Sequence, residues 1–199
     1  TPISFQERRL WPRYWLIDPL DGTKEFLKKN DEFTINIALI DQHKPILGVI
    51  FAPALDVCYL AEDTKGAFKQ IAQNRPQPLH SRAWEEGSTI TAAVSRRHGM
   101  NALKIFLAQF EHLNLLHCGS ALKFCFLAEG LADIYPRFSP TFEWDTAAGQ
   151  CILEQAGGAI IDYKGKPLRY NMSSSLQKIA FLAVADKSHC WLNYLKASI

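Results

Sequence analysis

Two aspartates three residues apart are the side chains of this sequence best suited to metal chemistry. Residues 18–23 read Asp-Pro-Leu-Asp-Gly-Thr and directly follow the apolar run 14–17, which predicts a buried strand that ends where the acids begin. Carboxylates are the ligands that Mg²⁺ prefers in proteins, often together with a substrate phosphate. Gly22 and Thr23 can add backbone N–H groups and a hydroxyl for a phosphate oxygen. The segment is therefore suited to hold a metal ion and an anion, although a surface turn is the simpler alternative.

A second segment offers a further carboxylate. Residues 143–149 read Glu-Trp-Asp-Thr-Ala-Ala-Gly, and an apolar stretch follows that ends at Gly157 and Gly158. The glycine pair is typical of a helix C-terminus, and Asp145 suits the cap of the helix N-terminus. One interpretation of Asp145 is a structural cap, and the other is a third metal ligand.

The elements that must position these residues fall into two parts. The first part is rich in strands, and a proline cluster at 74–78 is the best linker candidate. We expect its strands at 14–17, 34–41, 46–51, 57–62 and 67–70, with turns at 41–44 and 64–66. In the second part we expect strands near 89–94, 115–118, 132–135, 159–162 and 179–185, and helices near 101–110, 121–129, from 145 and near 187–196. The pattern predicts domains at 1–78 and 79–199 and sheets covered by helices.

Composition excludes several classes of protein. The 199 residues are 48% hydrophobic, which is enough for a substantial core. The net charge of +2 is spread without a basic stripe, so a nucleic-acid-binding module is disfavoured. No apolar run is long enough for a membrane span. The five cysteines are odd in number and lack a Cys-x-x-Cys spacing, which predicts a reducing compartment and neither a disulfide framework nor a zinc site.

The two acidic segments together resemble the signatures of the inositol monophosphatase superfamily, whose members are Mg²⁺-dependent, lithium-sensitive phosphatases. The run Lys24-Glu25-Phe26 and the segment 33–40 make the chain similar to one branch, the CysQ-type 3′(2′),5′-bisphosphate nucleotidases. The resemblance covers nearly all of the chain. It implies an α+β fold, a layered α-β-α-β-α sandwich with the active site between the two halves.

The resemblance also implies roles for individual residues. The implied ligands of two or more Mg²⁺ ions are Asp18, Asp21, Asp145 and the carbonyl of Leu20. Asp21 and Thr23 are implied in catalysis, Thr23 by orienting the attacking water. The implied substrate-binding residues are Gly22, Thr23, His98, Ser120, Lys123, Arg137 and Asp145. Among them, Lys123 and Arg137 are suited to pair with the phosphate that is not cleaved. Without the resemblance, Lys123 and Arg137 would be interpreted as solvated charges, and His98 as a surface loop residue.

The activity implied is hydrolysis of 3′-phosphoadenosine 5′-phosphate to AMP and phosphate, which clears a by-product of sulfate assimilation. The expected binding partner is this small nucleotide bisphosphate. The expected location is the cytoplasm, and peripheral association with the inner membrane is left open. The runner-up is an inositol-1-phosphate phosphatase, which the 24–26 run and the Ser120, Lys123 and Arg137 set disfavour. A catalytically impaired chain that only binds nucleotide or partner proteins is the alternative from a different class. The sequence leaves the oligomeric state open.

One departure from the family pattern concerns glutamates. The family carries a metal-ligating glutamate pair upstream of the first signature, whereas this sequence offers only Glu7 there, in the run Glu7-Arg8-Arg9 that is typical of solvated charge. We therefore expect an N-terminal segment of the family to be absent from this chain. Its loss predicts weaker Mg²⁺ binding, a rate lowered by about 10²- to 10⁴-fold without general-base assistance, and an exposed apolar face on the first sheet.

Overall fold

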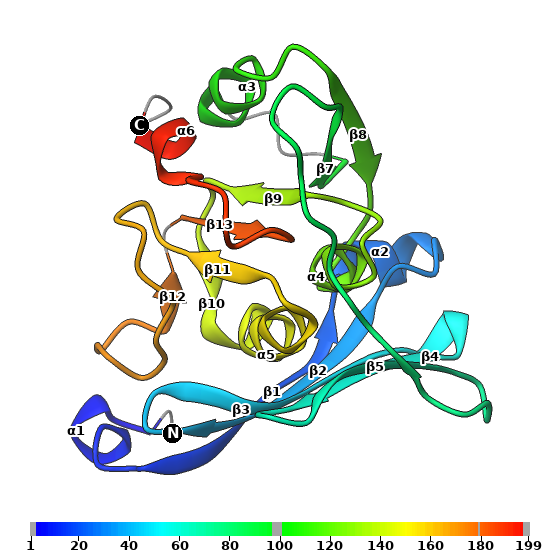
Figure 1. Cartoon of the computed structure of the whole chain (residues 1–199). Coiled ribbons are helices and arrows are strands. Elements are labelled where there is room, and N and C mark those ends of the chain that lie inside the picture. Colours follow the sequence, from blue (N-terminus) through cyan, green and yellow to red (C-terminus); the bar gives the residue numbers. More distant parts are fainter. Residues whose placement is uncertain (1–2, 97–100, 179, 197–199) are drawn as a thin grey trace.

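Two β-sheets organise the computed structural model, which describes residues 3–96, 101–178 and 180–196 (Figure 1). The first sheet is an antiparallel meander in which every strand pairs with its sequence neighbours. Its strands are β1 (Arg13–Asp21), β2 (Thr34–Asp41), β3 (Lys44–Ala52), β4 (Val57–Glu62), β5 (Gly66–Ile71) and β6 (Gln77–Pro78). The predicted turn between β2 and β3 is a tight hairpin, with positive φ angles of 48° at Gln42 and 67° at His43.

The second sheet is mixed, with the strand order β11-β13-β9-β7-β8. Its strands are β7 (Ile90–Val94), β8 (Leu113–His117), β9 (Ile134–Arg137), β11 (Ala159–Ile161) and β13 (Phe181–Val184). Strand β7 pairs in parallel with β8 and β9, while β13 is antiparallel to β9 and β11. A separate two-stranded ladder joins β10 (Thr141–Phe142) to β12 (Gln177–Lys178).

Helices form two layers around the second sheet (Figure 1). One layer lies between the sheets and the other packs on the far face of the second sheet. The helices are α1 (Phe5–Arg8), α2 (Thr23–Lys28), α3 (Asn101–Leu107), α4 (Leu122–Ala128), α5 (Ala147–Ala156) and α6 (Leu192–Lys196), with single 3₁₀ turns η1 (Pro53–Leu55) and η2 (Glu143–Asp145). Helices α4 and α5 fill the middle layer, and α3 and α6 the outer one. None of these helices is long and apolar enough to cross a membrane.

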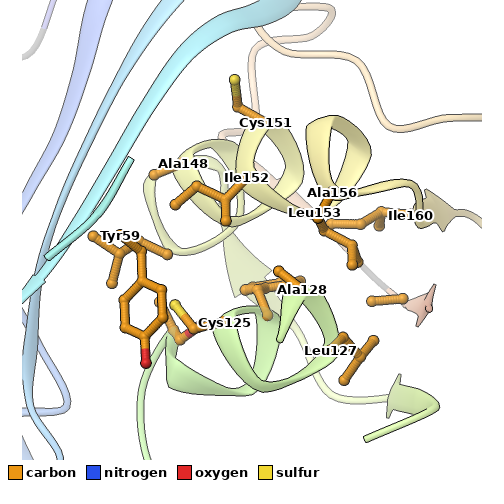
Figure 2. Close-up of a cluster of buried hydrophobic side chains, with 14 of the residues drawn as sticks. Tyr59, Cys125, Leu127, Ala128, Ala148, Cys151, Ile152, Leu153, Ala156 and Ile160 are labelled. Carbon is orange, nitrogen blue, oxygen red and sulfur yellow. The ribbon is translucent and has the colours of Figure 1, made fainter. Parts of the chain in front are cut away.

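The main core lies where α4 and α5 meet the first sheet (Figure 2). Ile152 and Leu153 of α5 and Leu127 of α4 are completely buried there. The sheet approaches α5 closely because Gly48 has no side chain: a Cβ atom at that position would lie 2.6 Å from the carbonyl oxygen of Ala148. This close contact fixes α5, and with it the turn that carries Asp145, against the sheet that carries Asp18 and Asp21.

Three expectations from the sequence need correction. Strand β1 is not fully buried, because its side chains alternate and Trp15 and Ile17 are 56% and 51% exposed. Helix α5 begins at Ala147 with Thr146 as its N-cap, so Asp145 does not cap it. Arg8 is not solvated: it is buried, and its guanidinium donates to the Asn171 side chain. In each case tertiary contacts outweigh the local pattern.

Candidate functional site

A bulge at the end of β1 brings Asp18 and Asp21 to the same side of the strand. Side chains three positions apart on a regular strand point to opposite faces. Here Asp18 pairs with Asn36 and Asp21 pairs with Thr34, so β1 carries one residue more than β2 across this stretch. The extra residue cancels the mismatch and turns both carboxylates toward the same space. Asp18 also accepts a hydrogen bond from the backbone N–H of Leu20 at 3.0 Å, which stabilises the bulge.

The turn η2 carries Asp145 toward the same space. One oxygen of the Asp145 carboxylate accepts hydrogen bonds from the Thr141 hydroxyl at 2.6 Å and from the Phe142 N–H at 2.9 Å. The first residue of the turn, Glu143, is 1% exposed, and its carboxylate accepts from Lys178 at 2.8 Å and from the Asn171 N–H at 2.9 Å. These bonds fix both ends of the turn, so the orientation of Asp145 is set before any ligand binds.

The three aspartates form a compact acidic cluster. One carboxylate oxygen of each residue lies within 4.8 Å of those of the other two. Burial and the negative charge of Asp145 raise the pKa of Asp21 to about 6, and burial also raises the pKa of Asp18. A cluster that is unfavourable when charged and that offers only oxygen ligands fits a hard divalent cation such as Mg²⁺.

The raised pKa of Asp21 predicts a pH effect on the metal-free protein. A folded-state pKa above the ordinary value of 3.8 means that the native state keeps this proton longer than the unfolded chain. Stability should therefore fall as pH rises from about 4 to about 6, by on the order of 2 to 3 kcal/mol from this group. Urea unfolding with EDTA at pH 4 and pH 7 measures it, and Asp21→Asn should remove that part of the difference. An identical pH dependence in the variant would contradict the assignment.

A cavity of about 230 Å³ opens beside the acidic cluster. The predicted site residues that line it are Asp21, Gly22, Ser120, Lys123, Arg137 and Asp145. Thr23 is exposed at the start of α2, and its hydroxyl donates to the Leu20 carbonyl at a long 3.5 Å. His98 lies outside the described residues. The structure thus brings the two acidic segments and most of the predicted substrate-binding residues to one place.

Lys123 and Arg137 are not the solvated charges that the local sequence favours. Lys123 is 2% exposed, and its ammonium donates to the carbonyls of Ser120 at 2.7 Å and Cys118 at 3.3 Å. Arg137 donates to the Tyr135 hydroxyl at 3.2 Å and to two backbone carbonyls. Both cations are therefore held in fixed positions in the cavity wall, where they offset the negative charge of the aspartates.

Glu32 fixes the turn that contains Ser120. Its carboxylate accepts from the Gly119 N–H at 2.8 Å, and its carbonyl accepts from the Ser120 hydroxyl at 2.8 Å. Arg96 forms a two-pronged ion pair with the same carboxylate. Gly22 also packs closely against this turn, because a Cβ atom at position 22 would lie only 3.2 Å from the Cβ atom of Ser120. This network joins the first acidic segment to the second half of the chain.

Sequence reasoning missed several polar residues that orient the aspartates. Asn36 is 1% exposed and donates to Asp21 at 3.3 Å, while Thr34, also buried, donates to Asn36 at 2.9 Å. The sequence did contain a clue to these residues. Thr34 and Asn36 alternate in step with Ala38 and Ile40, so they lie on the same buried face of β2. Polar residues in a buried phase need partners, and here the partner is a site residue.

Comparison with known proteins supports this geometry. Residues 6–187 match the model of the inositol monophosphatase family. The 3′(2′),5′-bisphosphate nucleotidase CysQ of Escherichia coli strain K12 is 45% identical over 90% of this chain and 71% of its own length. The CysQ of Haemophilus influenzae is 37% identical over 95% and 70%. A crystal structure of CysQ from Bacteroides thetaiotaomicron superposes with a TM-score of 0.84 at 35% identity, covering 94% of this chain and 75% of that one. The chain therefore belongs to the inositol monophosphatase family.

Proposed function

We propose that this protein is a Mg²⁺-dependent 3′(2′),5′-bisphosphate nucleotidase that converts 3′-phosphoadenosine 5′-phosphate to AMP and phosphate. The observation that carries the proposal is the cluster of Asp18, Asp21 and Asp145 beside a cavity whose wall contains Lys123 and Arg137. Carboxylates that hold a metal, with cations next to them, suit an anionic phosphate ester. The names of the relatives, bisphosphate nucleotidases at 45% identity, support the same substrate class.

Different residues of the site would bind the metal ions, orient the attacking water and accommodate the phosphate that is cleaved. Asp18, Asp21, Asp145 and the Leu20 carbonyl would hold two or more Mg²⁺ ions, which when bound activate water and stabilise the leaving oxygen. The Thr23 hydroxyl donates to the Leu20 carbonyl at 3.5 Å, and we assign to it the orientation of the attacking water. Gly22 lines the cavity beside Asp21 and leaves room for the phosphate that is cleaved.

The other predicted residues bind the substrate. Lys123 and Arg137 supply fixed positive charge in the cavity wall and so favour binding of the phosphate that is not cleaved. Ser120 lines the cavity, and its hydroxyl donates to the Glu32 carbonyl. His98 keeps its predicted role as a nucleotide contact. The proposal includes a cytoplasmic location. Peripheral association with the cytoplasmic face of the inner membrane is compatible with it.

The test of the proposal is a comparison of two substrates. Phosphate release is measured with Mg²⁺ from 3′-phosphoadenosine 5′-phosphate and from inositol 1-phosphate, and nucleotide binding is measured by calorimetry on the same preparation. Preferred turnover of the nucleotide supports the proposal. Preferred turnover of inositol 1-phosphate would replace it with the inositol phosphatase alternative, and nucleotide binding without turnover would identify a catalytically impaired binding protein.

A further inference from the structure

The turn before α4 holds a backbone conformation that needs outside support. Ser120 has a φ angle of 42°, in the left-handed region that residues other than glycine rarely adopt. A residue persists in this region only where the surrounding contacts hold it there. The turn also forms part of the cavity wall, because Cys118, Gly119 and Ser120 all line the cavity beside the acidic cluster. Whatever stabilises the turn therefore shapes the site.

The same turn determines where the Lys123 ammonium lies. This buried ammonium donates to the carbonyls of Ser120 at 2.7 Å and Cys118 at 3.3 Å. The two acceptors flank Gly119 in the sequence, so a change in the turn would move both of them. Because a lysine has a long, flexible stem, its ammonium takes its position from the groups that it meets. The conformation of the turn thus fixes a positive charge in the cavity wall.

Glu32 supports the turn from the first half of the chain. It lies between α2 and β2, and it contacts two consecutive residues of the turn. Its carboxylate accepts from the Gly119 N–H at 2.8 Å, and its backbone carbonyl accepts from the Ser120 hydroxyl at 2.8 Å. The segments are in close contact, since a Cβ atom at Gly119 would lie 3.1 Å from the Cβ atom of Glu32. Glu32 is not one of the described residues that line the cavity, so its effect on a ligand would pass through the turn.

Arg96 in turn holds the Glu32 carboxylate. The guanidinium donates to both carboxylate oxygens, with one of the two distances at 2.6 Å. This pairing is planar and two-pronged, so it restricts the orientation of the carboxylate as well as neutralising its charge. The Glu32 side chain is only 19% exposed, which shields the pair from water. The carboxylate is therefore aimed at the Gly119 N–H before any substrate binds.

We propose that Glu32 is a positioning residue for substrate binding, which holds the turn 118–120 in its left-handed conformation and thereby places Lys123 in the cavity wall. The inference rests on the proposed function, which assigns Lys123 to substrate binding. Without the Glu32 side chain, the Gly119 N–H loses its acceptor and the turn loses support, so the acceptors of Lys123 are no longer fixed. None of the hydrogen bonds that Glu32 forms in the described part of the chain reaches the three aspartates. Metal binding should therefore be preserved.

The test is the steady-state kinetics of Glu32 variants on 3′-phosphoadenosine 5′-phosphate with Mg²⁺. Glu32→Ala should raise KM by about 10- to 100-fold, as expected for lost hydrogen bonds to a charged group, and change kcat by less than about threefold. Glu32→Gln keeps an acceptor for the Gly119 N–H, so its KM should lie between those of the parent and Glu32→Ala. Stabilisation by Mg²⁺ in thermal unfolding should equal that of the parent. A loss confined to kcat, or a loss of Mg²⁺-induced stabilisation, would overturn the role.

A double-mutant cycle with Lys123→Met tests whether Glu32 acts through Lys123. In the Lys123→Met background, Glu32→Ala should raise KM by less than about twofold, because the group that it positions is already gone. A full additional increase in that background would overturn the proposed route. If Lys123→Met does not fold, the order of the KM values of the two Glu32 variants decides, and a Glu32→Gln variant no better than Glu32→Ala contradicts the role.

Glu62→Ala is the matched control, because it also removes a glutamate from an ion pair. Glu62 ends β4 and pairs with Lys65 at 2.7 Å on the surface, and neither residue lines the described cavity. Surface pairs contribute little, so this variant should behave like the parent. An equal rise in KM for Glu62→Ala would overturn the positioning role. A parent chain that neither binds nor cleaves the bisphosphate overturns the proposed function itself, whereas an active parent with an unchanged Glu32→Ala variant overturns the role of Glu32 alone.

Discussion

Asp21→Asn is expected to lower phosphate release from 3′-phosphoadenosine 5′-phosphate by about 10³-fold or more, since it removes one carboxylate from the acidic cluster that we propose as the metal site. The substitution keeps the size of the side chain, and it removes a charge that is unfavourable in the metal-free fold. Thermal unfolding in EDTA should therefore show equal or higher stability for the variant at pH 7. Loss of activity together with unimpaired folding would assign the effect to the metal site.

Asp41→Asn provides the control for this variant. Asp41 ends β2 and pairs with Arg13 at 2.8 Å on the surface, away from the acidic cluster. Surface pairs of this kind contribute about 1 kcal/mol or less, so activity should be unchanged. The stabilisation of the parent chain by Mg²⁺ should persist in Asp41→Asn and vanish in Asp21→Asn. An Asp21→Asn protein that retains both activity and Mg²⁺-induced stabilisation would contradict the assignment of this ligand.

Gly149→Ala is expected to be among the most destabilising single-methyl changes in the protein. Gly149 lies in α5 against Phe124 of α4, and a Cβ atom would lie 2.5 Å from Cγ and 2.9 Å from Cβ of that side chain. Phe124 is 2% exposed and packs against Tyr135 and Phe181, so it has little room to move. We expect a net cost of about 2 kcal/mol or more, despite the better helix propensity of alanine. Urea unfolding measures the loss.

Two further variants separate overpacking from other causes. The double variant Gly149→Ala/Phe124→Leu exchanges the clashing ring for a smaller side chain and should recover part of the stability. Gly87→Ala places the same methyl group in open space, and its cost should be limited to the strain of its φ angle of 85°. Equal losses for Gly149→Ala and Gly87→Ala would contradict the close-contact explanation.

The sequence predicted regular strands well and irregular features poorly. Strand β2 has the same bounds, 34–41, in the prediction and in the structure, because its alternation of buried and half-buried residues is uninterrupted. Short elements such as α2 and β10 were missed, since six or two residues give too little periodicity. The predicted helix near 101–110 is shortened to α3, which ends at Leu107. The predicted linker at 74–78 ends in β6, which pairs with β5, and the boundary between residues 78 and 79 stays a prediction.

The candidate site was predictable in its carboxylates but not in its supporting contacts. Asp18, Asp21 and Asp145 are recognisable because their segments resemble family signatures, and the structure clusters them. The bulge that aligns Asp18 with Asp21 depends on pairing with β2, which spacing along one strand does not reveal. The buried position of Lys123 depends on carbonyls that turn inward before α4. Contacts of this kind arise from tertiary structure, so local sequence patterns cannot show them.

The most direct test of the central claim is phosphorus NMR of 3′-phosphoadenosine 5′-phosphate incubated with the full chain and Mg²⁺. The account predicts that the 3′-phosphate resonance disappears, that inorganic phosphate appears, and that the 5′-phosphate of AMP remains. The same sample with EDTA should stay unchanged. Loss of the 5′-phosphate, or a spectrum that does not change although the protein is folded and binds Mg²⁺, would contradict the proposed hydrolysis of the 3′-phosphate at the cluster of Asp18, Asp21 and Asp145.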